Sequence, residues 1–168
     1  MVKIEDLKKI DLLNGLSDNL LELIAPHAHL SIFNTDTQLF ETNEDIDIFY
    51  MLIMGQVALK VALSDDVDII LDTIQSGSSF GIASLVPGTN ASSTAVCQEP
   101  CEIITLSARK MTELFNENND LGYQVMLRLA LRYKRIMENR ANMIMKTLDN
   151  NPEFKHKIAD IETLTPIF

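Results

Sequence analysis

Two pairs of residues in this sequence have side chains that could bind a metal ion or undergo redox chemistry. His27 and His29 form a His-x-His pair, which on a β-strand would share one face and could ligate a metal or haem. Cys97 and Cys101 are separated by three residues, and a loop between them could bring the thiols together. Neither pair has the further ligands of a zinc site, so no metal is expected. Free thiols and a helix-end or surface histidine are favoured, and a haem or redox sensor stays open.

Motifs of the common catalytic classes are missing. The chain has no His-Glu-x-x-His, no Gly-Lys-Ser/Thr phosphate loop and no Ser/His/Asp arrangement. Its carboxylates cluster in predicted turns, where exposure to solvent accounts for acidic residues without a catalytic role. The sequence therefore predicts a protein that is not an enzyme.

The spacing of apolar residues predicts three kinds of structure. In the first 29 residues apolar side chains recur every three or four positions, which indicates two helices separated near Gly15. After Leu106 the helical period returns, with Ser107 placed to cap a short helix and a long helix over about 120–148. Between these segments, short apolar runs separated by turn residues predict strands near 30–33, 38–41, 47–54, 56–63, 67–74, 92–98 and 101–106.

The predicted fold is mainly β with flanking helices, a β-roll or jelly-roll-like barrel of seven or eight strands. We expect one domain over 1–148 and a C-terminal tail over 149–168. Within the domain, a helical pair (1–29) precedes the barrel (30–106), and a hinge and long helix (107–148) follow it.

Two glycine motifs in the strand region carry a resemblance to a known family. Phe40 to Val57 resembles the signature F-x-x-G-D/E…Y-x-I-x-x-G-x-V, with Asn43 in place of the first glycine and Gly55 as the second. Residues 74–85 are similar to L-x-x-G-x-x-F-G-E-x-x-L. The strand pair, short helix and long helix that follow have the same order as in that family. Over about residues 12–140 the chain resembles the cyclic-nucleotide-binding domain of bacterial regulators and cyclic-nucleotide-gated proteins, as a catabolite-activator-like effector domain.

The resemblance also implies where a ligand would bind. In the family, amides of a short helix and an arginine neutralise the cyclic phosphate, and a glutamate accepts from the ribose hydroxyl. Here the glutamate position is Ile82, and the arginine position falls at Ala91 or Ser92. Cyclic-nucleotide binding is therefore expected to be lost or very weak, and any ligand should be less anionic. The remaining candidate ligand-binding residues are Gly81, Ile82, Ala83, Ser92, Ser93 and Arg128.

Charge is unevenly distributed along the chain, whose formal net charge is -10. Residues 30–106 contain eleven acidic residues and one basic residue, Lys60, whereas 121–148 contain six basic residues and one acidic residue. The acidic segment would oppose a bound phosphate. The overall acidity argues against nonspecific nucleic-acid or membrane binding. No apolar run approaches the ~20 residues of a membrane span, and no signal peptide is evident. We expect a soluble, cytoplasmic protein.

The long helix carries an apolar seam with a spacing near 3.5 residues. This pattern predicts packing against a twofold-related helix, and hence a homodimer. The seam residues are Met126, Ala130, Tyr133, Met137 and Ile144. About twenty residues follow the helix, fewer than a DNA-binding helix-turn-helix needs, so no nucleic-acid partner is expected. The predicted function is a stand-alone regulatory or sensory module, with a ligand-free dimerisation or interaction protein as the alternative and a further protein partner left open.

Overall fold

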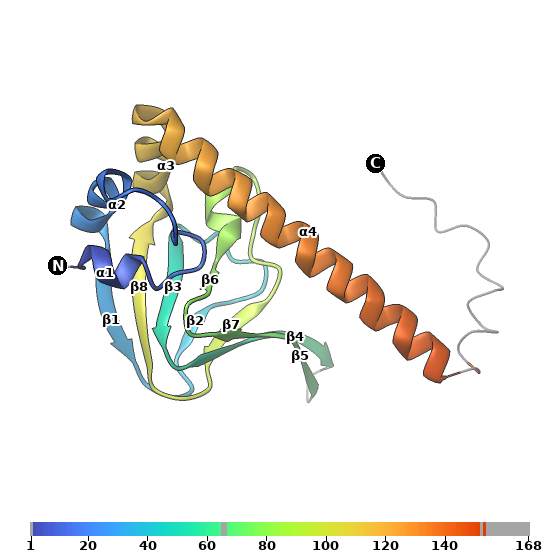
Figure 1. Ribbon diagram of the computed structural model, residues 1–168. Helices are drawn as coiled ribbons and strands as arrows, with labels where there is room; N and C mark the ends of the chain where they lie inside the picture. Colours follow the sequence, from blue (N-terminus) through green and yellow to red (C-terminus); the bar gives the residue numbers. More distant parts are fainter. Residues whose placement is uncertain (1, 65–66, 152, 154–168) are drawn as a thin grey trace. The chain divides into compact units, whose positions relative to one another are not determined.

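The N-terminal segment is helical, as predicted, but its first helix is short. The computed structural model describes residues 2–64, 67–151 and 153 (Figure 1). Helix α1 (Ile4–Leu7) is one turn long, α2 (Asp18–Ile24) follows Ser17, and the 3-10 helix η1 (Ala25–His27) leads into the first strand. Turns replace helix between α1 and α2 because Asp11 N–H donates to Gly77 O, 2.8 Å away, and Gly15 takes a φ of 81°.

In the part of the chain that the structure describes, eight strands form two four-stranded antiparallel sheets. One sheet has the order β1-β8-β3-β6 and the other β2-β7-β4-β5. The strands are β1 (His29–Phe33), β2 (Gln38–Phe40), β3 (Ile48–Met54), β4 (Gln56–Ser64), β5 (Val67–Gln75), β6 (Ser79–Phe80), β7 (Thr94–Cys97) and β8 (Cys101–Ser107).

The predicted fold class is confirmed, and the structure decides between the alternatives that the prediction left open. The sheets form an open roll of jelly-roll type rather than a closed barrel, because β1, β6, β2 and β5 each end a sheet. All seven predicted strands are present, but β6 is an eighth that was not placed. Strand β6 is only two residues long, which is too short to show a strand periodicity in the sequence. It exists because Tyr50 and Met51 of β3 pair with Phe80 and Ser79.

The hydrophobic core draws on both sheets. Its centre is an aromatic group in which the Tyr50 ring stacks on Phe80 at 5.0 Å and the Phe40 ring lies 5.6 Å from Tyr50. The buried cluster around this group is Phe40, Ile46, Tyr50, Leu52, Val57, Ile74, Phe80, Ala91, Ala95, Cys97, Cys101 and Ile103.

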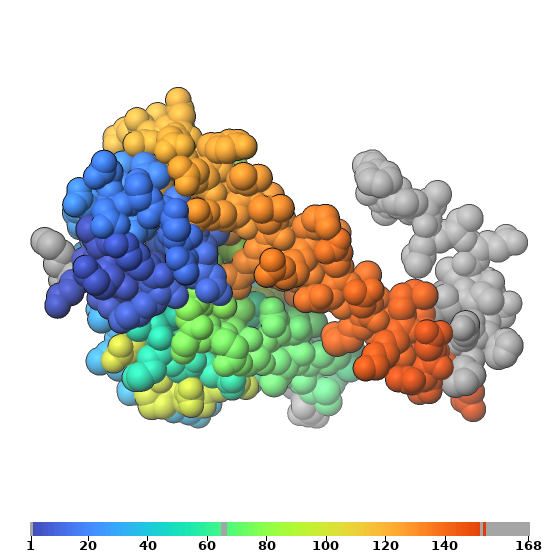
Figure 2. All heavy atoms as spheres, viewed as in Figure 1, coloured from blue at the N-terminus to red at the C-terminus, as the bar shows by residue number. Residues whose placement is uncertain are grey.

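Two helices follow β8. Helix α3 (Ala108–Glu117) begins directly after Ser107, and Figure 2 shows it side by side with α2. Helix α4 (Asn119–Asn150) confirms the predicted long helix, and Asn118 Oδ1 accepts from Leu121 N–H at 3.0 Å in its first turn. The first compact unit ends at Met126 and the second begins at Leu127.

Of the predicted tail, residues 152 and 154–168 lie outside the described residues, and the predicted division at 148 stays a prediction. Within the part of the chain that the structure describes, no helix is both long and apolar enough to cross a membrane.

Candidate functional site

The second glycine motif forms a short 3-10 helix, η2 (Ile82–Leu85), that lies on β3. Gly81 precedes it with a φ of 73°, a conformation that strains L side chains. A Cβ atom at Gly81 would lie 2.8 Å from Tyr50 Cδ2, so only glycine lets the backbone approach the tyrosine this closely. Ser84 Oγ donates to Gly81 O at 2.7 Å and fastens the turn. The predicted backbone donors Ile82 and Ala83 are both half-buried, and Ala83 packs against the core cluster that contains the aromatic group.

The first glycine motif begins with a turn that holds the loop after η2. Asn43 adopts a φ of 68°, which confirms that asparagine can replace the family's glycine there. Asn43 N–H donates to Ala91 O at 2.7 Å, and Ala91 N–H donates to Glu44 O at 2.8 Å. Asn90 Nδ2 donates to Asn43 O at 2.8 Å. The loop is thus fixed by contacts within the chain.

Hydroxyl groups also bind the turn at Asn43 to strand β7. Thr42 N–H donates to Thr94 Oγ1 at 3.1 Å, and the two threonine hydroxyls lie 3.1 Å apart. Sequence reasoning missed this pair and the backbone role of Glu44. Thr42 and Glu44 lie inside the first glycine motif, and this position was the one indication in the sequence that they have a role. No local sequence pattern indicates that they form hydrogen bonds with residues about fifty positions away.

The two positions proposed for the family's arginine differ sharply in environment. Ala91 is 3% exposed and belongs to the core cluster, whereas the adjacent Ser92 is exposed. Ser93 is again buried, at 5% exposure. The candidate hydroxyls of Ser92 and Ser93 therefore do not share one environment, and the side chain at position 91 is part of the packing between the sheets.

Electrostatics at this site disfavour negative charge. Tyr50 donates its hydroxyl to Leu39 O at 3.3 Å. Burial raises the pKa of Tyr50 to about 12, with Glu44 and Asp47 adding to the rise.

The two cysteines are free and buried, as the sequence indicated. Cys101 Sγ donates to Glu99 O at 3.2 Å. Burial raises the pKa of the Cys97 thiol to about 12, and the neighbouring Cys101 contributes to the rise. Since the thiolate is the reactive form, the Cys97 thiol suits packing better than redox chemistry.

The two histidines lie at the junction of η1 and β1. His27 ends η1 and is half-buried, and His29 begins β1 and is exposed. In residues 2–64, 67–151 and 153, no group of three or more His, Cys, Asp and Glu side chains is arranged to hold a metal ion. A role for either histidine in haem binding stays a prediction.

The remaining candidate residues lie on α4. Arg128 belongs to the second compact unit, so its predicted part in ligand binding stays a prediction. The seam side chains Met126, Ala130, Tyr133, Met137 and Ile144 are all exposed in the single chain.

The left-handed backbone at Asn43 leads to a direct test of this turn. Asn43→Ala should lower the free energy of unfolding by about 1 kcal/mol, because alanine tolerates positive φ less well than asparagine. Asn43→Gly should change it by no more than about 0.5 kcal/mol. Urea denaturation followed by circular dichroism measures both. Equal losses in the two variants would show that the backbone conformation is not the cause.

Comparison with known sequences places this site in context. A family model described as the cyclic nucleotide-binding domain matches residues 31–118. The cAMP-activated global transcriptional regulator CRP of Pasteurella multocida is 29% identical over 127 residues, which are 75% of this chain and 61% of that protein. The same regulator of Haemophilus influenzae is 25% identical over 127 residues, covering 75% of this chain and 57% of that protein. The chain thus spans only part of the length of these curated relatives.

Solved structures with the same fold support this match. A candidate cyclic nucleotide-binding protein from Geobacter metallireducens superposes with a TM-score of 0.72 at 23% identity, over 82% of this chain and 99% of that one. A cyclic nucleotide-binding domain from Methylobacillus flagellatus gives a TM-score of 0.66 at 18% identity, over 98% of this chain and 84% of that one. At these identities the likeness shows the fold alone.

Proposed function

Because the chain belongs to the cyclic nucleotide-binding domain family, we propose that it is a non-enzymatic regulatory module in which binding of ordinary cyclic nucleotides is lost or altered. The main support is the loop that follows η2. Ala91 is packed in the core, and both of its backbone hydrogen-bonding groups are bonded to the turn at Asn43 and Glu44. Ile82 offers no acceptor for a ribose hydroxyl. Neither position supplies the charge that a cyclic phosphate requires.

The ligand class follows from the same residues. Backbone amides at Ile82 and Ala83 and the hydroxyls of Ser92 and Ser93 suit a neutral polar group better than a phosphate, since Glu44 and Asp47 act on this region. The alternative is a ligand-free interaction protein, which the internal bonds of the loop also favour.

A conformational change at this site can be transmitted to the C-terminal helix through α3. Helix η2 contacts α3, and α3 continues through Asn118 into α4. Movement of η2 would therefore shift the start of α4 and change the surface that α4 presents. We propose that the module acts through this surface as a homodimer along the Met126–Ile144 seam, or on a protein partner.

The Pasteurella relative is a transcriptional regulator, and for this chain nucleic-acid binding is not part of the proposal. The acidic segment 30–106 would repel a phosphate backbone.

Ligand titration tests the proposal. Addition of 1 mM cyclic AMP, cyclic GMP or a cyclic dinucleotide should raise the melting temperature by less than about 1 °C, because a dissociation constant above 1 mM stabilises the fold by less than about 0.4 kcal/mol. Thermal shift and calorimetry measure this. Binding with a dissociation constant near 10 μM would stabilise by about 2.7 kcal/mol and contradict the proposal.

A further inference from the structure

The turn between α1 and α2 contains Asn14 followed directly by Gly15, the one Asn-Gly pair in the sequence. Both residues are exposed, and residues 11–15 form turns rather than helix or strand. Glycine has no Cβ atom, so its amide nitrogen is less hindered than that of any other residue. The pair therefore places a side-chain amide next to an unusually accessible backbone nitrogen.

The Gly15 nitrogen is also not held by a hydrogen bond. Gly15 takes a φ of 81°, and among the described residues no oxygen accepts from its N–H. The amides on either side are bonded, since Asn14 N–H donates to Ile10 O at 2.8 Å and Leu16 N–H donates to Leu13 O at 3.0 Å. The turn thus leaves available the one backbone nitrogen that can attack the Asn14 side chain.

Two other exposed asparagines lack this arrangement. Asn19 precedes Leu20, whose N–H donates to a backbone oxygen 3.0 Å away. Asn90 precedes Ala91, whose N–H donates to Glu44 O at 2.8 Å. In both places the following amide is hydrogen-bonded and its residue has a Cβ atom. These asparagines are internal references within the same molecule.

We propose that Asn14 is a site of spontaneous deamidation through a cyclic imide formed with Gly15. The Gly15 nitrogen bonds to Asn14 Cγ, and the Cγ–Nδ2 bond breaks to release ammonia, which carries away the amide proton of Gly15. Water then opens the imide at one of its two carbonyl carbons. Opening at Cγ gives aspartate, and opening at the main-chain carbonyl gives isoaspartate. One water is consumed and one ammonia is released, with no oxidation.

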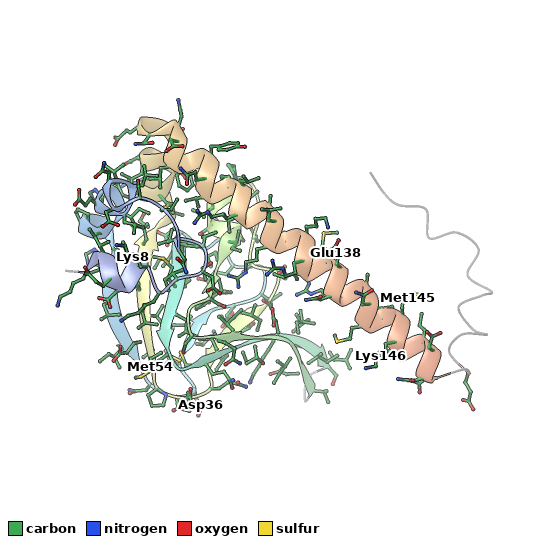
Figure 3. All side chains as sticks on the ribbon, in the orientation of Figure 1. Lys8, Asp36, Met54, Glu138, Met145 and Lys146 are labelled. Carbon is green, nitrogen blue, oxygen red and sulfur yellow. The ribbon has the colours of Figure 1, made fainter. Side chains whose placement is uncertain are left out.

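The two products differ in what they do to the fold. Leu13 and Leu16 are 0% and 4% exposed, so isoaspartate would insert an additional main-chain atom between two core side chains. Aspartate adds only a negative charge to a turn that the ion pair between Lys8 and Asp18, at 2.7 Å, already spans (Figure 3 labels Lys8). The isoaspartate form should therefore be the less stable product. The inference uses only this N-terminal segment and is independent of the proposed ligand and dimer.

Peptide mapping by mass spectrometry tests the site in the intact, folded chain. During incubation at pH 8 and 37 °C, Asn14 should be converted at least ten times as fast as Asn19 or Asn90. Similar conversion at the three positions overturns the inference, as does an Asn14 that stays unmodified. The same measurement in urea shows whether the fold protects the pair. A rate in the folded chain below one tenth of the rate in urea also overturns the inference.

Asn14→Gln is the matched variant, because glutamine keeps the side-chain amide but would have to close a larger ring. Isoaspartate is counted by an isoaspartyl carboxyl methyltransferase with labelled S-adenosylmethionine. After incubation the unsubstituted chain should accept methyl groups, and the Asn14→Gln variant should accept at most one tenth as many. Circular dichroism checks that the variant folds. Equal methylation of the two chains contradicts the site.

Asn14→Asp separates the added charge from the altered main chain. Its melting temperature should lie within about 1 °C of that of the unsubstituted chain, whereas the isoaspartate form should melt at least about 3 °C lower. Ion-exchange chromatography separates the forms, and thermal unfolding followed by circular dichroism compares them. An isoaspartate form as stable as the unsubstituted chain would overturn the expected effect on the packing of Leu13 and Leu16.

Discussion

The Ala91→Arg variant is expected to lose about 3 kcal/mol or more of its free energy of unfolding. Position 91 is the first of the two places for the family's arginine, and its side chain lies in the core cluster with Phe40 and Tyr50. A guanidinium there must be desolvated without a carboxylate among the cluster residues, or must break the bonds that Ala91 makes to Asn43 and Glu44. Urea denaturation followed by circular dichroism measures the loss.

The neighbouring residue is the matched control. Ser92 is exposed, so Ser92→Arg should change the free energy of unfolding by no more than about 0.5 kcal/mol. If the second alignment of the arginine is correct, Ile82→Glu combined with Ser92→Arg should also introduce measurable cyclic AMP binding. An Ala91→Arg variant as stable as Ser92→Arg would show that position 91 is not a core position.

The Gly55→Ala variant should also lose about 3 kcal/mol or more. Gly55 joins β3 to β4 with a φ of 102°, a conformation that disfavours any side chain. An added Cβ atom would lie 2.6 Å from Cys101 Sγ and 2.7 Å from Pro100 O. The second contact is with backbone and the thiol is buried, so neither can move aside without displacing the start of β8.

Gly88→Ala separates the steric effect from the effect of φ. Gly88 has a φ of 76°, but a Cβ atom there would meet nothing within 4 Å. Its loss should therefore be only the backbone strain, about 1–2 kcal/mol. Chemical denaturation of both variants gives the comparison, and similar losses would mean that the β7–β8 loop yields to the new methyl group.

Local sequence patterns were sufficient for most of the fold. Strands such as Ile48–Met54 and helix α4 are long enough for their periodicity to be read, and Gly55 and Asn43 marked turns that do have positive φ. Strand β6 and the length of α1 were not predictable, because both depend on pairing with distant residues. The Tyr50–Phe80 register defines β6, and Gly77 O holds Asp11 outside a helix.

The candidate site depends even more on contacts between residues that are distant in the sequence. The sequence by itself determined the family resemblance, the loss of the glutamate at Ile82 and the absence of an arginine before Arg109, because residue identity alone decides which charges exist. Only the tertiary structure decided that Ala91 is a core position while Ser92 is exposed, and that Thr42, Asn43 and Glu44 bond to the loop at Asn90–Thr94. Burial and long-range hydrogen bonds depend on how the two sheets pack, and no local pattern in the chain records that packing.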